Sequence, residues 1–157
     1  MANEVEIGRG KRGRRAYTMD DIALVSARRT RDPADVNVGW QIDAYHVDVP
    51  IMAAPMDSVM SPDTAILFGK LGGIGVLDLD GLWTRYENPQ PILDEIAQLP
   101  ADGSIARFQQ IYSAPIQEDL ITERLEYIRK AGVVVAGKLS PQRTHRYWRA
   151  VVEAGVD

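Results

Sequence analysis

The chain has 157 residues, 45% of them hydrophobic, which is long and apolar enough for one ordinary domain with a buried core. Its formal net charge of −4 disfavours nucleic acids and anionic membranes as partners. Without cysteine it holds no disulfide, thiolate metal site or cysteine nucleophile, and its two histidines, His46 and His145, lack the spacing of zinc ligands. Apolar runs fall short of the ~20 residues that cross a bilayer, and the N-terminus lacks a signal peptide's apolar stretch. We therefore expect a cytoplasmic protein.

Residues 1–16 are rich in glycine and basic side chains. The segment GRGKRGRRA has no hydrophobic periodicity, which predicts a flexible basic arm. Such an arm could grip phosphate groups or nucleic acid, or it could be a solvated tail. Ordered structure is expected from Tyr17 onward, so residues 17–157 form the second predicted part of the chain.

The most informative segment is PIMAAPMDSVMSPDTAILFGKLGGIGV, residues 50–76. Its apolar beginning predicts a strand over 49–54 that is covered on both faces, as in parallel sheets. A Ser-Pro pair at 61–62 predicts the start of a helix. The glycine pair at 72–73 predicts its end, and a second strand follows over 74–79.

The same pattern returns later in the chain. Apolar residues at helical spacing predict a helix over 116–131, and VVVAG predicts a buried strand over 133–137. A second Ser-Pro pair at 140–141 begins another helix. Repeated strand–helix units predict a parallel α/β architecture. Between the two units, 80–112 is less regular, with one short helix expected at 91–99.

The last three residues, Gly155–Asp157, stand where the pattern expects another strand. About three strands and three helices fit into the chain, whereas a closed (β/α)8 barrel needs ~250 residues. We expect this chain to be the N-terminal part of a longer barrel protein.

The segment APMDSV, followed by GKLGGIGV, resembles the start of the barrel in the IMP dehydrogenase/GMP reductase family. TMDDIALVS, the DPADV turn and the terminal VVEAGVD fit the same resemblance, and GLWTRY at 81–86 resembles a shorter branch without the tandem regulatory insertion. The resemblance implies an α/β TIM barrel, a homotetramer, a purine nucleotide monophosphate as substrate and NAD or NADP as cofactor. It also allows a monovalent cation, bound outside this segment.

The resemblance implies three substrate-binding residues at and just after the end of the first strand. In the family, the residues that match Ala54 and Met56 lie against the nucleotide, and Asp57 follows them at the barrel mouth. Two alternatives remain open: Met56 could fill a gap in the core, and Asp57 could cap the loop.

The predicted cofactor-binding residues are Asp78, Lys138 and Ser140. Asp78 lies in the stretch where the family's dehydrogenases carry a histidine pair. Lys138 and Ser140 follow a predicted strand and precede a helix start, where amides favour anions. A basic side chain there suits the extra phosphate of NADP, although Lys138 could also extend into solvent.

The predicted function is IMP dehydrogenase-like, from IMP to XMP with reduction of NAD, in guanine nucleotide metabolism. GMP reductase, from GMP to IMP with NADPH, is the second hypothesis. A non-catalytic nucleotide-binding or scaffolding relative is the third. The family's catalytic cysteine has no counterpart in this chain, so no catalytic residue is predicted here and the chain alone is expected to be inactive.

Overall fold

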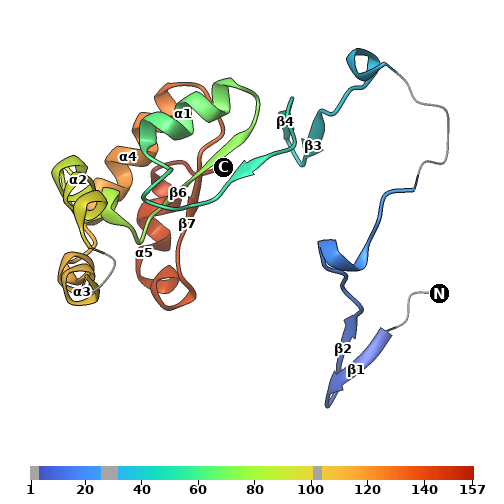
Figure 1. Cartoon of the computed structure of the whole chain (residues 1–157), viewed down its shortest axis with the longest axis horizontal. Helices are drawn as coiled ribbons and strands as arrows, with labels where there is room; N and C mark the ends of the chain where they lie inside the picture. Colours follow the sequence, from blue (N-terminus) through green and yellow to red (C-terminus); the bar gives the residue numbers. More distant parts are fainter. Residues whose placement is uncertain (1–3, 26–31, 101–103) are drawn as a thin grey trace. The chain divides into compact units, whose positions relative to one another are not determined.

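A computed structural model describes residues 4–25, 32–100 and 104–157. The chain divides into two compact units, Met1–Asn37 and Val38–Asp157 (Figure 1). Among the described residues, no helix is both long and apolar enough to span a membrane.

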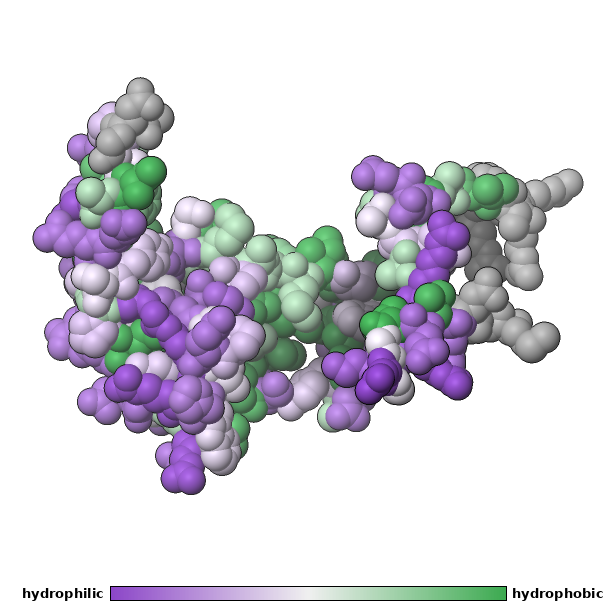
Figure 2. Space-filling view, turned by 90° about the horizontal axis from the view of Figure 1, so that it is seen from below, coloured by the Kyte–Doolittle hydropathy of each residue, from purple (hydrophilic) through white to green (hydrophobic). Residues whose placement is uncertain are grey.

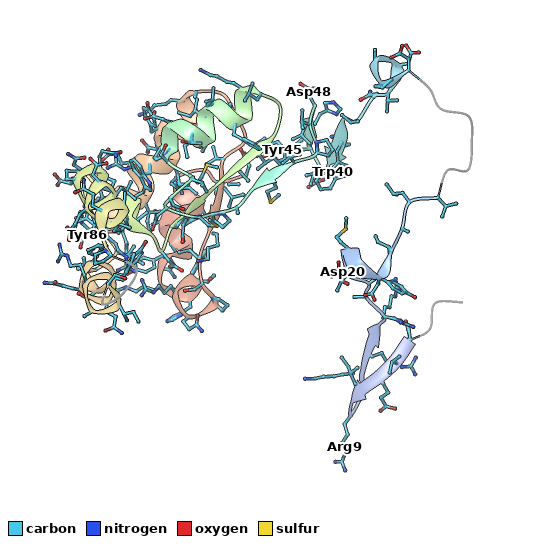
Figure 3. All side chains as sticks on the ribbon, in the orientation of Figure 1. Arg9, Asp20, Trp40, Tyr45, Asp48 and Tyr86 are labelled. Carbon is cyan, nitrogen blue, oxygen red and sulfur yellow. The ribbon has the colours of Figure 1, made fainter. Side chains whose placement is uncertain are left out.

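The first unit contains a β-hairpin. β1 (Glu4–Gly8) pairs antiparallel with β2 (Lys11–Arg14), and Arg9 lies at the tip between them (Figure 3). Gly10 in this turn has φ +70°, which glycine adopts without steric cost. The sequence predicted no regular structure in residues 1–16, of which 1–3 lie outside the described residues. The hairpin was not predicted because backbone pairing holds its strands together and neither strand has a buried residue. Two 3-10 helices also belong to this unit: η1 (Met19–Asp21) and η2 (Pro33–Asp35).

The second unit is built around a parallel sheet of three strands in the order β5–β6–β7. β5 (Met52–Ala53) and β7 (Ala136–Lys138) pair with opposite edges of β6 (Ile74–Asp78). A hairpin of β3 (Trp40–Ile42) and β4 (Tyr45–Val47) precedes the sheet in the chain. The helices are α1 (Pro62–Lys70), η3 (Leu82–Thr84), α2 (Gln90–Gln98), α3 (Ile105–Ser113), α4 (Glu118–Lys130) and α5 (Pro141–Glu153). The predicted parallel α/β architecture is confirmed.

β6 is covered on both faces. Leu77 is fully buried and belongs to the main core together with Leu125 of α4. On the opposite face, Ile74 and Val76 belong to a smaller core with Val47 of β4. α1 packs against β6, and α4 packs against both α1 and α5. This double coverage is the physical reason for the continuous apolar run that predicted the strand.

Helix boundaries follow the predicted capping residues. The Oγ of Ser61 accepts a hydrogen bond from the Thr64 amide at 3.0 Å, and Pro62 is the first residue of α1. Gly72 has φ +92° after α1, and Gly132 has φ +72° after α4. Both values lie in the left-handed region that ends helices at glycine.

The strands are shorter than predicted, while the expected helix at 91–99 is displaced by one residue. β5 covers only two residues of the predicted run 49–54. β7 begins later than the predicted strand at 133–137. Just before it, the Val135 amide donates to the Asp157 carboxylate at 2.8 Å, and the Val135 carbonyl accepts from the Asp157 amide at 3.0 Å. α3 was not predicted.

Candidate functional site

The candidate site lies at the carboxyl ends of the three parallel strands. Asp57 lies in the loop after β5, Asp78 ends β6 with Asp80 beyond it, and Lys138 ends β7 with Ser140 beyond it. Parallel strands bring these ends to the same edge of the sheet, which is where open α/β sheets and barrels bind ligands. The edge therefore gathers acidic, basic and hydroxyl side chains from three loops.

Asp57 joins the loop after β5 to η3 and α3. The Leu82 amide donates to both carboxylate oxygens at 3.0 Å, and the Tyr112 hydroxyl donates to Oδ2 at 2.8 Å. Burial raises the pKa of Asp57, while these hydrogen bonds oppose the increase. A Cβ at Gly81 would lie 2.2 Å from Oδ1, so a side chain there would displace the carboxylate. These contacts are those of a loop anchor, and contact with a nucleotide stays a prediction.

The three predicted cofactor-binding residues come together around Asp80. The Asp80 amide and the Lys138 ammonium donate to Oδ1 of Asp78, at 3.0 and 3.3 Å. Oδ2 of Asp80 accepts from the Ser140 amide at 2.7 Å and lies 3.7 Å from the Lys138 ammonium. Within the described residues, Oδ1 of Asp80 is buried without a hydrogen-bond partner. The Ser140 side chain makes no capping bond to α5.

The other two predicted substrate residues are exposed. Ala54 lies on the surface and Met56 is 50% exposed, so Met56 is not buried in the core of this unit, and its role in a complete barrel stays a prediction. Ile51 and Met52 are also more than half exposed, so apolar surface runs along β5 and into the loop after it (Figure 2). A nearby cavity of about 370 Å³ is lined by Asp57 but by neither Ala54 nor Met56.

Three residues of this region were missed from the sequence. Asp80 connects the loops after β6 and β7. Its position, two residues after the strand-end Asp78, was a sequence signal that could have identified it as a site residue. Arg85 is buried, and its Nε donates to the Asp80 carbonyl at 3.0 Å while its Nη1 donates to the Ala114 carbonyl. Tyr112 gave no signal, because it reaches Asp57 from a helix that was not predicted.

This chain belongs to the IMP dehydrogenase/GMP reductase domain family, whose model matches residues 16–157. It is 38% identical to an uncharacterized oxidoreductase of Mycolicibacterium smegmatis, over 98% of this chain and 42% of the relative. An uncharacterized oxidoreductase of Mycobacterium tuberculosis is 37% identical over the same shares. The chain thus spans less than half the length of these relatives.

Two further similarities are informative. A crystal structure of an IMP dehydrogenase/GMP reductase-like protein from Corynebacterium glutamicum has a TM-score of 0.82 and 39% identity, covering 98% of this chain and 43% of that one. The inosine-5'-monophosphate dehydrogenase of Methanocaldococcus jannaschii is 36% identical over 64 residues, which are 41% of this chain and 13% of that protein. Similarity to the uncharacterized oxidoreductases therefore extends much further along the chain than similarity to this dehydrogenase.

Proposed function

We propose that this chain forms the N-terminal part of an NAD(P)-dependent purine nucleotide oxidoreductase with a (β/α)8 barrel, most similar in activity to IMP dehydrogenase. The observation that carries the proposal is the meeting of Asp57, Asp78, Asp80, Lys138 and Ser140 at the carboxyl edge of a parallel sheet. That edge is the ligand-binding end of such barrels. Membership of the family and the oxidoreductase names of the relatives support it.

The exposed stretch that includes Ala54 and Met56 is proposed to receive the purine nucleotide monophosphate. A thioether beside a flat base gives favourable dispersion contact, since sulfur is polarizable. The half-exposed side chain of Met56 leaves room for such a contact. Asp57 would act behind this surface, holding its loop through the Leu82 amide and the Tyr112 hydroxyl.

The residues around Asp80 fit a dinucleotide cofactor. Its unpaired Oδ1 can accept a hydrogen bond from a hydroxyl group, and the uncapped Ser140 hydroxyl can donate one to a phosphate. The Lys138 side chain is 43% exposed, so its ammonium can contact a ligand while Asp78 and Asp80 orient it. A cofactor held by these residues would supply the hydride-transfer chemistry. The family's catalytic cysteine is proposed to lie outside this chain.

GMP reductase is the second candidate, favoured by a specific observation. Lys138 at the candidate cofactor site and the arginines nearby in α5 supply positive charge that suits a cofactor with an additional phosphate.

The test is an assay of the purified full-length protein with IMP and NAD, and separately with GMP and NADPH, followed at the absorbance of the reduced nicotinamide. NADH formation from IMP supports the dehydrogenase, and NADPH loss with GMP supports the reductase. A protein that binds IMP or GMP in calorimetry without turnover would be the non-catalytic relative. If it neither binds nor converts either nucleotide, the proposal is wrong.

A further inference from the structure

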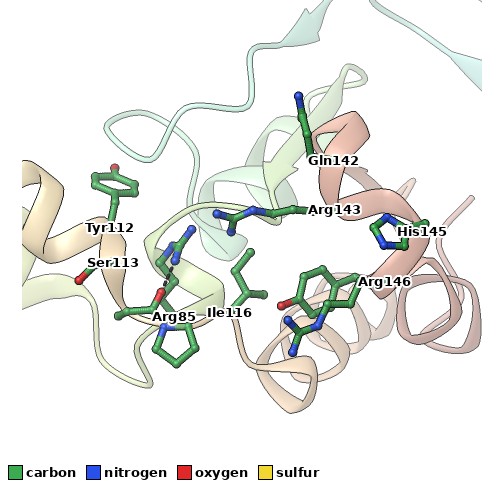
Figure 4. A pocket seen from close by; sticks show the side chains of 11 residues that line it. Arg85, Tyr112, Ser113, Ile116, Gln142, Arg143, His145 and Arg146 are labelled. Carbon is green, nitrogen blue, oxygen red and sulfur yellow. Dashed lines mark hydrogen bonds between the residues drawn. The ribbon is translucent and has the colours of Figure 1, made fainter.

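A second cavity in the same unit is rich in arginine. It has a volume of about 550 Å³ and lies between the loop after β6, the segment joining α3 to α4, and the first turns of α5 (Figure 4). We call it the arginine pocket, and its polar lining includes Arg85, Tyr112, Gln142, Arg143, His145 and Arg146. None of the residues that line it is an aspartate or glutamate.

The positive charges of the pocket have few local counter-charges. Arg143 extends from α5 toward Arg85, as Figure 4 shows. The pKa of Arg85 is lowered first by burial and then by Arg143, whereas Asp80, Tyr86 and Asp57 oppose the shift. Among the described residues, Arg143 and Arg146 form no ion pair. Bringing guanidinium groups together without paired carboxylates is unfavourable unless an anion joins them.

Arg85 is held rigidly at the wall of the pocket. Arg85 is only 6% exposed, and the backbone carbonyls of Asp80 and Ala114 accept hydrogen bonds from its Nε and Nη1. The Gln117 amide group also donates to the Arg85 carbonyl at 2.7 Å. No hydrogen bond within the described residues uses its Nη2. A fixed guanidinium with a free N–H group is well suited to bind an oxyanion, because little conformational entropy is lost on binding.

The first turn of α5 adds to this preference. Gln142 and Arg143 lie in that turn, and α5 has 13 residues. The partial positive charge at a helix N-terminus favours anions. The Ser140 amide already donates a hydrogen bond to Asp80. We therefore expect the guanidinium groups, and not that amide, to bind an anion in the pocket.

We propose that the arginine pocket binds a phosphate monoester through Arg85, Arg143 and Arg146. A phosphate presents several oxygens, so more than one planar guanidinium group can bind it through paired hydrogen bonds. A single carboxylate has fewer oxygens and cannot satisfy the three arginines as fully. The phosphate can come from two sources, an NADP-type cofactor or a separate phosphorylated metabolite. Only the first source depends on the proposed oxidoreductase function.

The test is isothermal titration calorimetry of the full-length protein with inorganic phosphate at constant ionic strength. Arg143→Gln and Arg146→Gln should each weaken phosphate binding roughly tenfold, since each removes charge-assisted hydrogen bonds. Arg149→Gln is the matched control, because Arg149 lies on the same helix but does not line the pocket. Arg85 is left unchanged because its burial and its bonds to two backbone carbonyls make it part of the fold.

Repeating the titration with NADP and with NAD separates the two sources. If NADP displaces phosphate and Arg143→Gln weakens NADP binding but not NAD binding, the site holds the cofactor's additional phosphate. If phosphate binds unchanged in saturating NADP, the site serves another phosphorylated ligand. Absence of phosphate binding, or equal weakening by Arg149→Gln, overturns the proposal. Neither result depends on turnover, so the site can fail while the proposed enzyme activity stands.

Discussion

Asp57 shows how a single buried carboxylate connects fold and pH dependence. Burial raises its pKa above the ordinary value of 3.8, so the folded state binds the proton more tightly than the unfolded state does. The contribution of Asp57 to stability is therefore greatest when it is protonated, and it decreases as pH rises from 3.8 through the raised pKa. Above the raised pKa, Asp57 is ionised in both the folded and the unfolded state, so its contribution to stability no longer changes with pH.

Replacing this side chain should remove its part of the pH dependence. Asp57→Asn keeps an oxygen for the Leu82 amide but cannot ionise, so we expect the free energy of unfolding to change less with pH from 3.8 upward. Urea unfolding at a series of pH values measures this. Asp119→Asn, at an exposed position in α4, controls for the loss of one carboxylate. An unchanged slope in Asp57→Asn would contradict the expectation.

Met56 separates ligand binding from stability. It is 50% exposed, so Met56→Ala in the full-length protein should lower the melting temperature little, in contrast to the ~2–5 kcal/mol that truncating a core methionine costs. If the side chain contacts the nucleotide, affinity for IMP or GMP should fall several-fold in calorimetry. Met60→Ala is the matched control, because Met60 is buried and should lose stability. A large fall in melting temperature for Met56→Ala with unchanged affinity would disprove the assignment.

Lys138 tests which cofactor the site prefers. Its ammonium lies 3.3 Å from Asp78 and 3.7 Å from Asp80, so part of its charge is already balanced. Lys138→Ala should weaken NADP(H) binding more than NAD(H) binding if the ammonium also contacts the additional phosphate. Lys130→Ala, at a surface lysine paired with Glu126, is the control. Equal effects on both cofactors would leave Lys138 as a residue that positions Asp78 and Asp80.

At the scale of elements, β6 and α1 approach closely at one glycine. A Cβ on Gly75 would lie 2.6 Å from the Cα of Ala65, which is 1% exposed in α1. Gly75→Ala should therefore destabilise the protein by about 1–3 kcal/mol, as overpacking of a core does. Urea unfolding measures the loss. Gly13→Ala, where a Cβ would meet its nearest neighbour at 3.4 Å, is the control. Equal stability of the two variants would show that the helix shifts without cost.

The elements that sequence predicted well are those whose signals are local. The Ser61 cap and the buried run of β6 follow from adjacent residues, and both are present as expected. What the sequence did not reveal depends on distant partners. Asp157 bonds to the Val135 backbone across 22 positions, and Tyr112 reaches Asp57 across 55 positions. Neither contact has a spacing that a single sequence can display.

The same distinction applies to the candidate site. Asp78, Lys138 and Ser140 were predicted as separate strand-end residues, and the structure brings them together. Asp80, which connects them, was overlooked because its role depends on the distance between two loops. Family resemblance supplied the expected ligands, but the arginine pocket became visible only when α5 was packed beside Arg85.

At the scale of the whole molecule, the sheet has two edges at which no further strand pairs among the described residues. β5 and β7 each pair with β6 alone within the described residues. At the β5 edge, the apolar side chains of Ile51 and Met52 are exposed. Unpaired strand edges and exposed apolar surface favour pairing with further strands. The family match and the 42% of the M. smegmatis relative that the chain spans support our proposal that further strands complete this sheet in the full-length protein.

This arrangement predicts that the 157-residue chain has no turnover by itself. It contains no cysteine to attack a purine ring, and its open sheet leaves the strand-end loops without the neighbours of a closed barrel. The purified chain should form no NADH from IMP and NAD, and should consume no NADPH with GMP, under conditions in which the full-length protein is active. Calorimetry with the same nucleotides would show whether the chain retains binding. Turnover by the isolated chain at a rate near that of the full-length protein would show that the described strand ends, without a cysteine, are sufficient for the chemistry.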